Sequence, residues 1–145
     1  PFANPRVAET ISASIDQGLA QGGARDVTAE HREGPRVVTW EGATYLLPTI
    51  VHCESPDHPL ANREFLFPFA SVVEVEPSQL PGVLGPSLVA TVLTSDTALA
   101  HRFLASPLVH RLNIGPIPTP QVDWLQPHEG NLVEFLYRSR ALQVG

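Results

Sequence analysis

The sequence has 145 residues (15.7 kDa), of which 43% are hydrophobic and 17% charged, a composition typical of a folded protein rather than a disordered one. Nine arginines, no lysine and 15 acidic residues give a net charge of −6, which argues against a nucleic-acid-binding face because phosphate contacts need clustered positive charge. No apolar stretch approaches the ~20 residues that span a bilayer, and no basic segment followed by an apolar run indicates a signal peptide. We therefore expect a protein that binds neither membranes nor nucleic acid.

The use of cysteine and methionine bears on the origin of the chain. The single cysteine, Cys53, excludes an internal disulfide framework and fits a reducing compartment, so we expect a cytoplasmic protein. Methionine does not occur and the sequence starts at Pro1, which leads us to expect a fragment of a longer chain. One domain is the default at this length, so we expect residues 1–145 to form a single domain.

The N-terminal third predicts a helix followed by a β-hairpin. Apolar residues recur at every fourth position within residues 5–20, and a Gly-Gly pair ends the helix. β-Branched and aromatic residues then fill residues 36–40 and 45–51 on either side of a Glu-Gly pair, which predicts two strands joined by a tight turn. Pro48 weakens the second strand, or places it at an edge or bulge, because proline cannot donate a ladder hydrogen bond.

After a proline-rich loop, the chain alternates between strands and helices. We expect, in order, a loop at 53–68 with a helical turn at 60–63, a strand at 70–76, a short helix at 78–84, a strand at 88–93, a helix capped by Ser95 and ending at about 105, a strand at 108–114, a loop at 115–127 and a last helix at 131–142. Such alternation is typical of βαβ units, whose strands are parallel. The predicted fold class is α/β: a partial, doubly wound, mostly parallel sheet flanked by helices, with the N-terminal helix and β-hairpin on it or beside it.

One short segment contains several residues of the types that bind metals: His52, Cys53, Glu54 and His58. A tetrahedral zinc site needs ligands that converge, usually from two short pairs, and no second pair follows at a useful distance. We therefore interpret the segment as a solvated loop and predict no metal site.

Cys53 is also the candidate nucleophile, with His52 and His58 as neighbouring bases. The carboxylates of Glu54 and Asp57 would raise the pKa of its thiol rather than lower it, which argues against this role. The sequence contains neither a G-x-S-x-G nucleophile elbow nor a glycine-rich phosphate loop. The residues themselves therefore predict no catalytic group.

Glu64 is the remaining candidate for a functional residue. It follows Arg63 and precedes the sequence FLFPF, at the junction between a loop and a strand. A carboxylate in such a place can accept hydrogen bonds from ligand hydroxyls. A salt bridge to Arg63 is the alternative, and the local sequence favours it.

Four motifs occur in an order that resembles the aldehyde dehydrogenase superfamily. The segments YLLPTIV at 45–51 and REFLFPF at 63–69 resemble that family's aromatic-x-x-Pro-Thr strand and E-x-F-G-P segment. Further on, LVATVLTSD at 88–96 and the Leu-Asn pair at 112–113 resemble its G-L-x-x-x-[VI]-[FW]-[TS]-x-D and V-N segments. Together with the N-terminal helix, the resemblance covers most of the chain in the right order.

The resemblance implies the C-terminal part of the catalytic domain of a longer enzyme that uses NAD or NADP to oxidise a small-molecule aldehyde to an acid. In that family a cysteine upstream of this region is the nucleophile, so Cys53 is not expected to fill that role and the fragment alone is not expected to be active. Glu64 aligns with the glutamate that binds the nicotinamide ribose hydroxyls. Leu66 stands where a phenylalanine packs near the nicotinamide, so these two residues are the predicted cofactor-binding residues.

Two departures from the family pattern bear on cofactor handling. Phe67 stands where the motif has glycine, and a phenylalanine cannot adopt a positive φ or allow a close approach of the backbone without a cost. The sequence PHEGN at 127–131 also lacks the family's glycine-rich G-G-x-K-x-S-G element.

Two alternatives remain open. One is a non-catalytic module of the same ancestry that assembles as a homo-oligomer, with contacts from residues 36–40 and 132–142. The other is an unrelated small α/β binding protein, which a sheet order incompatible with one parallel, doubly wound sheet would favour.

Overall fold

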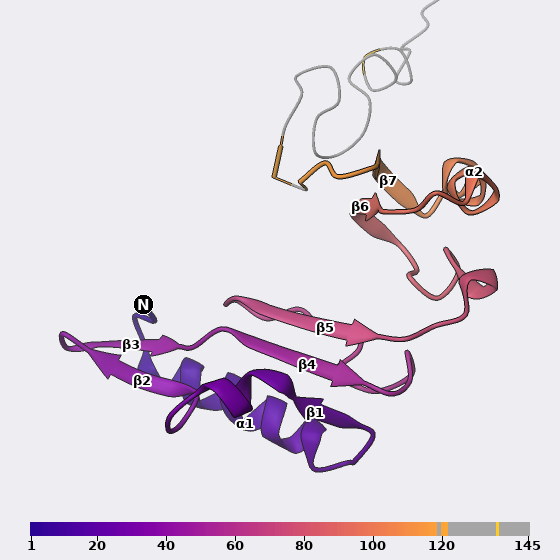
Figure 1. Cartoon of the computed structure of the whole chain (residues 1–145). Helices are drawn as coiled ribbons and strands as arrows, with labels where there is room; N and C mark the ends of the chain where they lie inside the picture. The colour runs from indigo at the N-terminus through magenta and orange to yellow at the C-terminus, as the bar shows by residue number, and fades with distance from the viewer. Residues whose placement is uncertain (119, 122–135, 137–145) are drawn as a thin grey trace, which may run out of the picture. The chain divides into compact units, whose positions relative to one another are not determined.

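The computed structural model describes residues 1–118, 120, 121 and 136 (Figure 1). The chain divides into two compact units, Pro1–Val75 and Glu76–Gly145. Among the described residues, no helix has the length and apolar character needed to cross a membrane. The helix expected at 131–142 lies outside the described residues, Leu136 excepted, as does part of the loop expected before it.

The first unit combines helices with two small sheets. Its elements are α1 (Pro5–Leu19), β1 (Ala24–Asp26), η1 (Val27–His31, a 3₁₀ helix), β2 (Val37–Trp40), β3 (Ala43–Leu46), β4 (Thr49–Cys53) and β5 (Phe69–Val73). Strands β1, β4 and β5 form one sheet in that order, in which β1 runs antiparallel and β5 parallel to β4 (Figure 1). Strands β2 and β3 form a separate antiparallel hairpin.

Helix α1 begins where its sequence supplies a cap. The side-chain oxygen of Asn4 accepts the N–H of Arg6 at 3.1 Å, and Pro5 occupies the first turn, where its missing N–H is not needed. Ala8 and Ile15 are fully buried, as expected for the inner face of an amphipathic helix. The helix predicted at 5–20 is confirmed.

The region expected to form one hairpin contains a hairpin and a further strand. The predicted turn is confirmed, because Glu41 and Gly42 have φ of 48° and 77°, as a two-residue hairpin turn between twisted strands requires. The single strand expected at 45–51 is wrong: β3 ends at Leu46, and β4 begins at Thr49 in the other sheet. Pro48 lies in the gap, where its missing N–H takes no hydrogen bond away from either ladder.

The core of the first unit lies between α1 and the three-stranded sheet. Ile15, Val51, Cys53 and Leu60 form a cluster in which no member is more than 2% exposed. Leu60 belongs to the loop before β5 and lies against Gly18 of α1, where an added Cβ would be only 2.7 Å from the Leu60 Cγ. The glycine therefore allows the loop to pack directly on the helix.

The second unit contains a parallel pair of strands. Its elements are η2 (Pro77–Gln79), β6 (Ser87–Val92), α2 (Thr97–Ala105) and β7 (Val109–Ile114). Strands β6 and β7 are parallel and α2 connects them, as in a βαβ unit. The strands predicted at 88–93 and 108–114 are confirmed. With the parallel pair β4–β5 and the helices, they confirm the α/β class.

Three local expectations are wrong. Asp96 rather than Ser95 caps α2, since its side chain accepts the N–H of Ala98 at 2.8 Å. Both residue types are good caps, so the sequence does not choose between neighbours. The helix expected at 78–84 is reduced to η2 because proline and glycine interrupt it, and turns replace the helical turn expected at 60–63.

Candidate functional site

The segment that leads into β5 alternates in burial along its length. Phe65, Phe67 and Phe69 are partly buried and pack against the core of the first unit. Glu64 and Leu66, which alternate with them, are exposed, Leu66 to 88%. Successive side chains of an extended chain point to opposite sides. The segment therefore has an aromatic inner side and an outer side that presents both predicted cofactor-binding residues.

The three aromatic rings contact one another. The ring centroids of Phe65 and Phe69 lie 4.8 Å apart with their planes at 78°, an edge-to-face arrangement. The Phe67 centroid lies 6.2 Å from that of Phe65 and 6.0 Å from that of Phe69. Residues 63–67 make no main-chain hydrogen bond with any described residue. Side-chain packing therefore holds this segment on the core.

Glu64 is free of partners in the part of the chain that the structure describes, where it forms no hydrogen bond or ion pair. The guanidinium of Arg63 lies instead over the Phe65 ring, with Cζ 5.5 Å from the ring centroid. The salt bridge between the two neighbours, the alternative at the sequence level, is thus not formed. Both carboxylate oxygens of Glu64 remain available to accept hydrogen bonds from hydroxyl groups.

Phe67 does not require the backbone conformation that a glycine at its position would permit. Among the described non-glycine residues, Glu41 is the one with a positive φ. Phe67 therefore has an ordinary backbone, and the cost that a positive φ would impose on a phenylalanine does not arise here. Its ring adds buried apolar contact to the core instead.

The residues considered as metal ligands or as a nucleophile do not form one site. His52 and Cys53 are successive residues of β4, so their side chains point to opposite faces of the sheet. The His52 Nε2 lies 3.9 Å from a Glu74 carboxylate oxygen, whereas the Cys53 Sγ lies 3.6 Å from the Nδ1 of His58 in the interior. No three His, Cys, Asp or Glu side chains converge within the described ranges. Burial raises the pKa of the Cys53 thiol, which disfavours the thiolate.

Comparison with known proteins identifies the fold but no sequence relative. No protein-family model and no curated protein matches the chain. The structure matches lactaldehyde dehydrogenase from Escherichia coli with a TM-score of 0.64 and 15% identity, over 88% of this chain and 25% of that one. The chain has the fold of part of an aldehyde dehydrogenase. An indole-3-acetaldehyde dehydrogenase solved in complex with NAD+ matches with a TM-score of 0.58 and 21% identity, over 75% of this chain and 22% of that one.

The aldehyde dehydrogenase resemblance predicted from the order of the motifs is thus confirmed for the fold. The chain spans about a quarter of the length of the dehydrogenases it matches.

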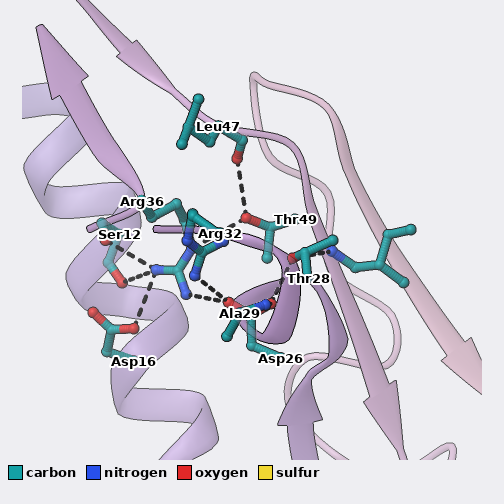
Figure 2. A network of polar contacts seen from close by, with 10 residues as sticks. Ser12, Asp16, Asp26, Thr28, Ala29, Arg32, Arg36, Leu47 and Thr49 are labelled. Atoms are coloured by element: carbon teal, nitrogen blue, oxygen red, sulfur yellow. Dashed lines mark hydrogen bonds and ion pairs between the residues drawn. The ribbon is translucent and has the colours of Figure 1, made fainter. Parts of the chain in front are cut away.

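Within this aldehyde dehydrogenase fold, a polar network centred on a buried arginine joins α1, β1 and β4 (Figure 2). Arg36 is 5% exposed and donates from Nη2 to an Asp26 carboxylate oxygen at 3.0 Å. Its Nη1 donates to Asp16 at 3.1 Å, and its Nε donates to the hydroxyl of Thr49 at 3.1 Å. Arg32 donates to the same Asp26 oxygen at 2.8 Å. The sequence did not reveal this network, because its members follow no periodicity.

The network controls the charge of Asp26. Burial alone would raise the pKa of this carboxyl group, but hydrogen bonds from Thr28, Arg32 and Arg36 outweigh burial and lower the pKa to about 2. Asp26 is therefore ionised at neutral pH. Because Arg36 is buried here, it does not offer the contact surface considered for residues 36–40, whereas Trp40 is 63% exposed.

Proposed function

We propose that the chain is the C-terminal part of the catalytic domain of a longer, aldehyde dehydrogenase-like oxidoreductase that converts an aldehyde to a carboxylic acid with NAD or NADP. The observation that carries the proposal is the setting of Glu64, an exposed carboxylate without a partner among the described residues, in a fold shared with aldehyde dehydrogenases. That one of these enzymes was solved in complex with NAD+ supports a dinucleotide as the ligand.

Glu64 is proposed to hold the cofactor through its nicotinamide ribose. An ionised carboxylate accepts hydrogen bonds at two oxygens and can engage two neighbouring hydroxyl groups at once. Leu66, exposed on the same side of the segment, offers an apolar surface for the nicotinamide ring. The bound cofactor supplies the acceptor for the hydride that leaves the aldehyde carbon.

The reactive thiol is proposed to come from elsewhere in the longer protein, which acts in the cytoplasm. Cys53 is fully buried, and burial raises the pKa of its thiol, so neither access nor ionisation favours it as the nucleophile. The isolated 145-residue chain is therefore expected to bind cofactor weakly and to oxidise no aldehyde. Its contribution is the carboxylate for the ribose and the scaffold that carries it.

The substitution Glu64→Gln in the protein at its natural length tests the proposal. Glutamine keeps the size of the side chain but removes its charge, and hydrogen bonds to charged groups contribute about 1.5–3 kcal/mol, so KM for the dinucleotide is expected to rise roughly tenfold or more. Glu33→Gln removes another exposed charge from the same unit and is expected to leave KM unchanged. Equal KM values for the two variants would contradict the proposal.

A second candidate, a non-catalytic module that assembles as a homo-oligomer, is favoured by the exposure of Trp40. This side chain ends β2 and is 63% exposed, and tryptophan is enriched among residues that anchor protein interfaces. Light scattering of the protein with and without Trp40→Ser tests this candidate. An assembly that dissociates on substitution supports it, and a strict monomer at high concentration opposes it.

A further inference from the structure

Phe67 occupies the position where the E-x-F-G-P segment of the family has glycine. It lies three residues after Glu64, and its ring is on the inner side of the segment, whereas Glu64 is on the outer side. The ring contacts both aromatic neighbours, with centroid distances of 6.2 Å to Phe65 and 6.0 Å to Phe69. Phe67 therefore completes the set of rings that attaches the segment to the core.

The position of Glu64 depends on these rings because the main chain around it is not hydrogen-bonded. Residues 63–67 have no main-chain hydrogen-bond partner among the described residues. The next main-chain hydrogen bond along the segment is at Pro68, whose carbonyl accepts the Thr49 N–H at 3.0 Å. Without the Phe67 ring, the main chain between Glu64 and Pro68 would keep one inward anchor, Phe65. A segment attached in this way samples more conformations, and binding must then restrict them.

We propose that Phe67 is a positioning residue that fixes the Glu64 carboxylate and the Leu66 side chain outward before the cofactor binds. The inference rests on the proposed function, in which Glu64 accepts hydrogen bonds from the ribose hydroxyls. Glycine at this position would have no side chain to hold the backbone on the core, whereas the partly buried phenylalanine packs there. The conformational entropy of the segment is then lost when the protein folds rather than when the cofactor binds, so the cofactor affinity is higher.

Calorimetric titration of the protein at its natural length with NAD+, and in parallel with NADP+, tests this role. Phe67→Gly, which restores the residue of the family motif, is expected to weaken binding of the preferred dinucleotide by roughly 5- to 20-fold. Phe67→Leu keeps a large apolar anchor and is expected to stay within about twofold of the unsubstituted protein. If Phe67 acts through Glu64, Phe67→Gly has little further effect in a Glu64→Gln background.

Backbone ¹⁵N relaxation of the cofactor-free protein gives an independent readout, one that does not depend on hydrogen-bonded amides. The order parameters of residues 64–67 are expected to fall in Phe67→Gly, while Phe67→Leu keeps them close to those of the unsubstituted protein. Unchanged order parameters in Phe67→Gly would overturn the inference. Thermal unfolding identifies a variant that fails to fold, in which case Phe67→Ala replaces it in both measurements.

The outcomes separate this inference from the proposed function. If Glu64→Gln leaves dinucleotide affinity unchanged, the role of Glu64 falls, and the role of Phe67 falls with it. If Glu64→Gln weakens binding but Phe67→Gly does not, the proposed function stands and the positioning role of Phe67 is overturned.

Discussion

Arg36 and Asp26 form a buried ion pair with an N–O distance of 3.0 Å, and their side chains are only 4% and 7% exposed. Asp26 also caps η1, since its side chain accepts the N–H of Ala29 at 3.0 Å. Asp26 is thus the last residue of β1, its carboxylate caps η1, and the same carboxylate pairs with Arg36, which also donates hydrogen bonds to α1. Because a buried charge is costly without its partner, the first unit depends on the pair being complete.

Removing the guanidinium of Arg36 is expected to destabilise the protein strongly. Arg36→Met keeps the apolar stem but leaves Asp26 with fewer compensating donors, so the free energy of unfolding in urea is expected to fall by about 3 kcal/mol. Arg25→Met is the matched control, because Arg25 pairs with Glu30 at 3.4 Å where both side chains are more than 60% exposed. It is expected to change stability by less than about 0.5 kcal/mol. Similar losses in both variants would contradict the assigned importance of the buried pair.

The lowered pKa of Asp26 predicts a loss of stability in acid. Its pKa is about 2 in the folded protein and 3.8 in the unfolded chain, so the unfolded state binds the proton more readily. The contribution of Asp26, about 2 kcal/mol, is therefore fully present above about pH 4 and lost as the pH falls through 2. Unfolding of the unsubstituted protein and of Asp26→Asn across this range measures it: the difference between them should shrink by this amount. A constant difference would show that the pKa of Asp26 is not lowered.

Local sequence patterns predicted much of the fold. The spacing of apolar residues and the Gly-Gly pair indicated α1, and the Glu-Gly pair indicated the hairpin turn. Helix α1 and the hairpin turn each depend on residues that are close together in the sequence, so local patterns can predict them. For Glu64, by contrast, the local sequence favoured a salt bridge to Arg63, whereas the Arg63 guanidinium lies over the Phe65 ring.

The expectations that the structure corrects concern residues whose partners are distant in the sequence. Pro48 was seen to weaken a strand, but the transfer of the chain from one sheet to another depends on pairing with β1 and β5, which no local pattern encodes. Arg36 was assigned to a strand with an interface role, yet its acceptors Ser12, Asp16 and Asp26 precede it by 10 to 24 residues.

Cys53 is expected to be nearly unreactive in the folded protein. The thiol is fully buried, and burial raises its pKa, so both access and thiolate fraction are low. Labelling of the 145-residue chain with a thiol reagent at pH 8 should be at least about 100-fold slower in buffer than in concentrated urea, since reaction needs an opening of the structure. The readout is specific because the chain has one cysteine. Equal rates in the two solvents would mean that Cys53 is accessible.

Gly18 is expected to reject even a methyl group, although alanine normally favours a helix interior by about 1 kcal/mol. An added Cβ would lie 2.7 Å from the Cγ of Leu60 and 2.9 Å from both of its methyl carbons, and Leu60 is itself buried. Gly18→Ala is therefore expected to destabilise the protein by about 1–3 kcal/mol in urea unfolding, whereas Gln17→Ala on the exposed side of α1 is expected to be nearly neutral. The cause can be isolated by combining Gly18→Ala with Leu60→Ala, which removes the colliding atoms. If the clash is responsible, the double variant loses less stability than the sum of the single losses; simple additivity would place the cause elsewhere.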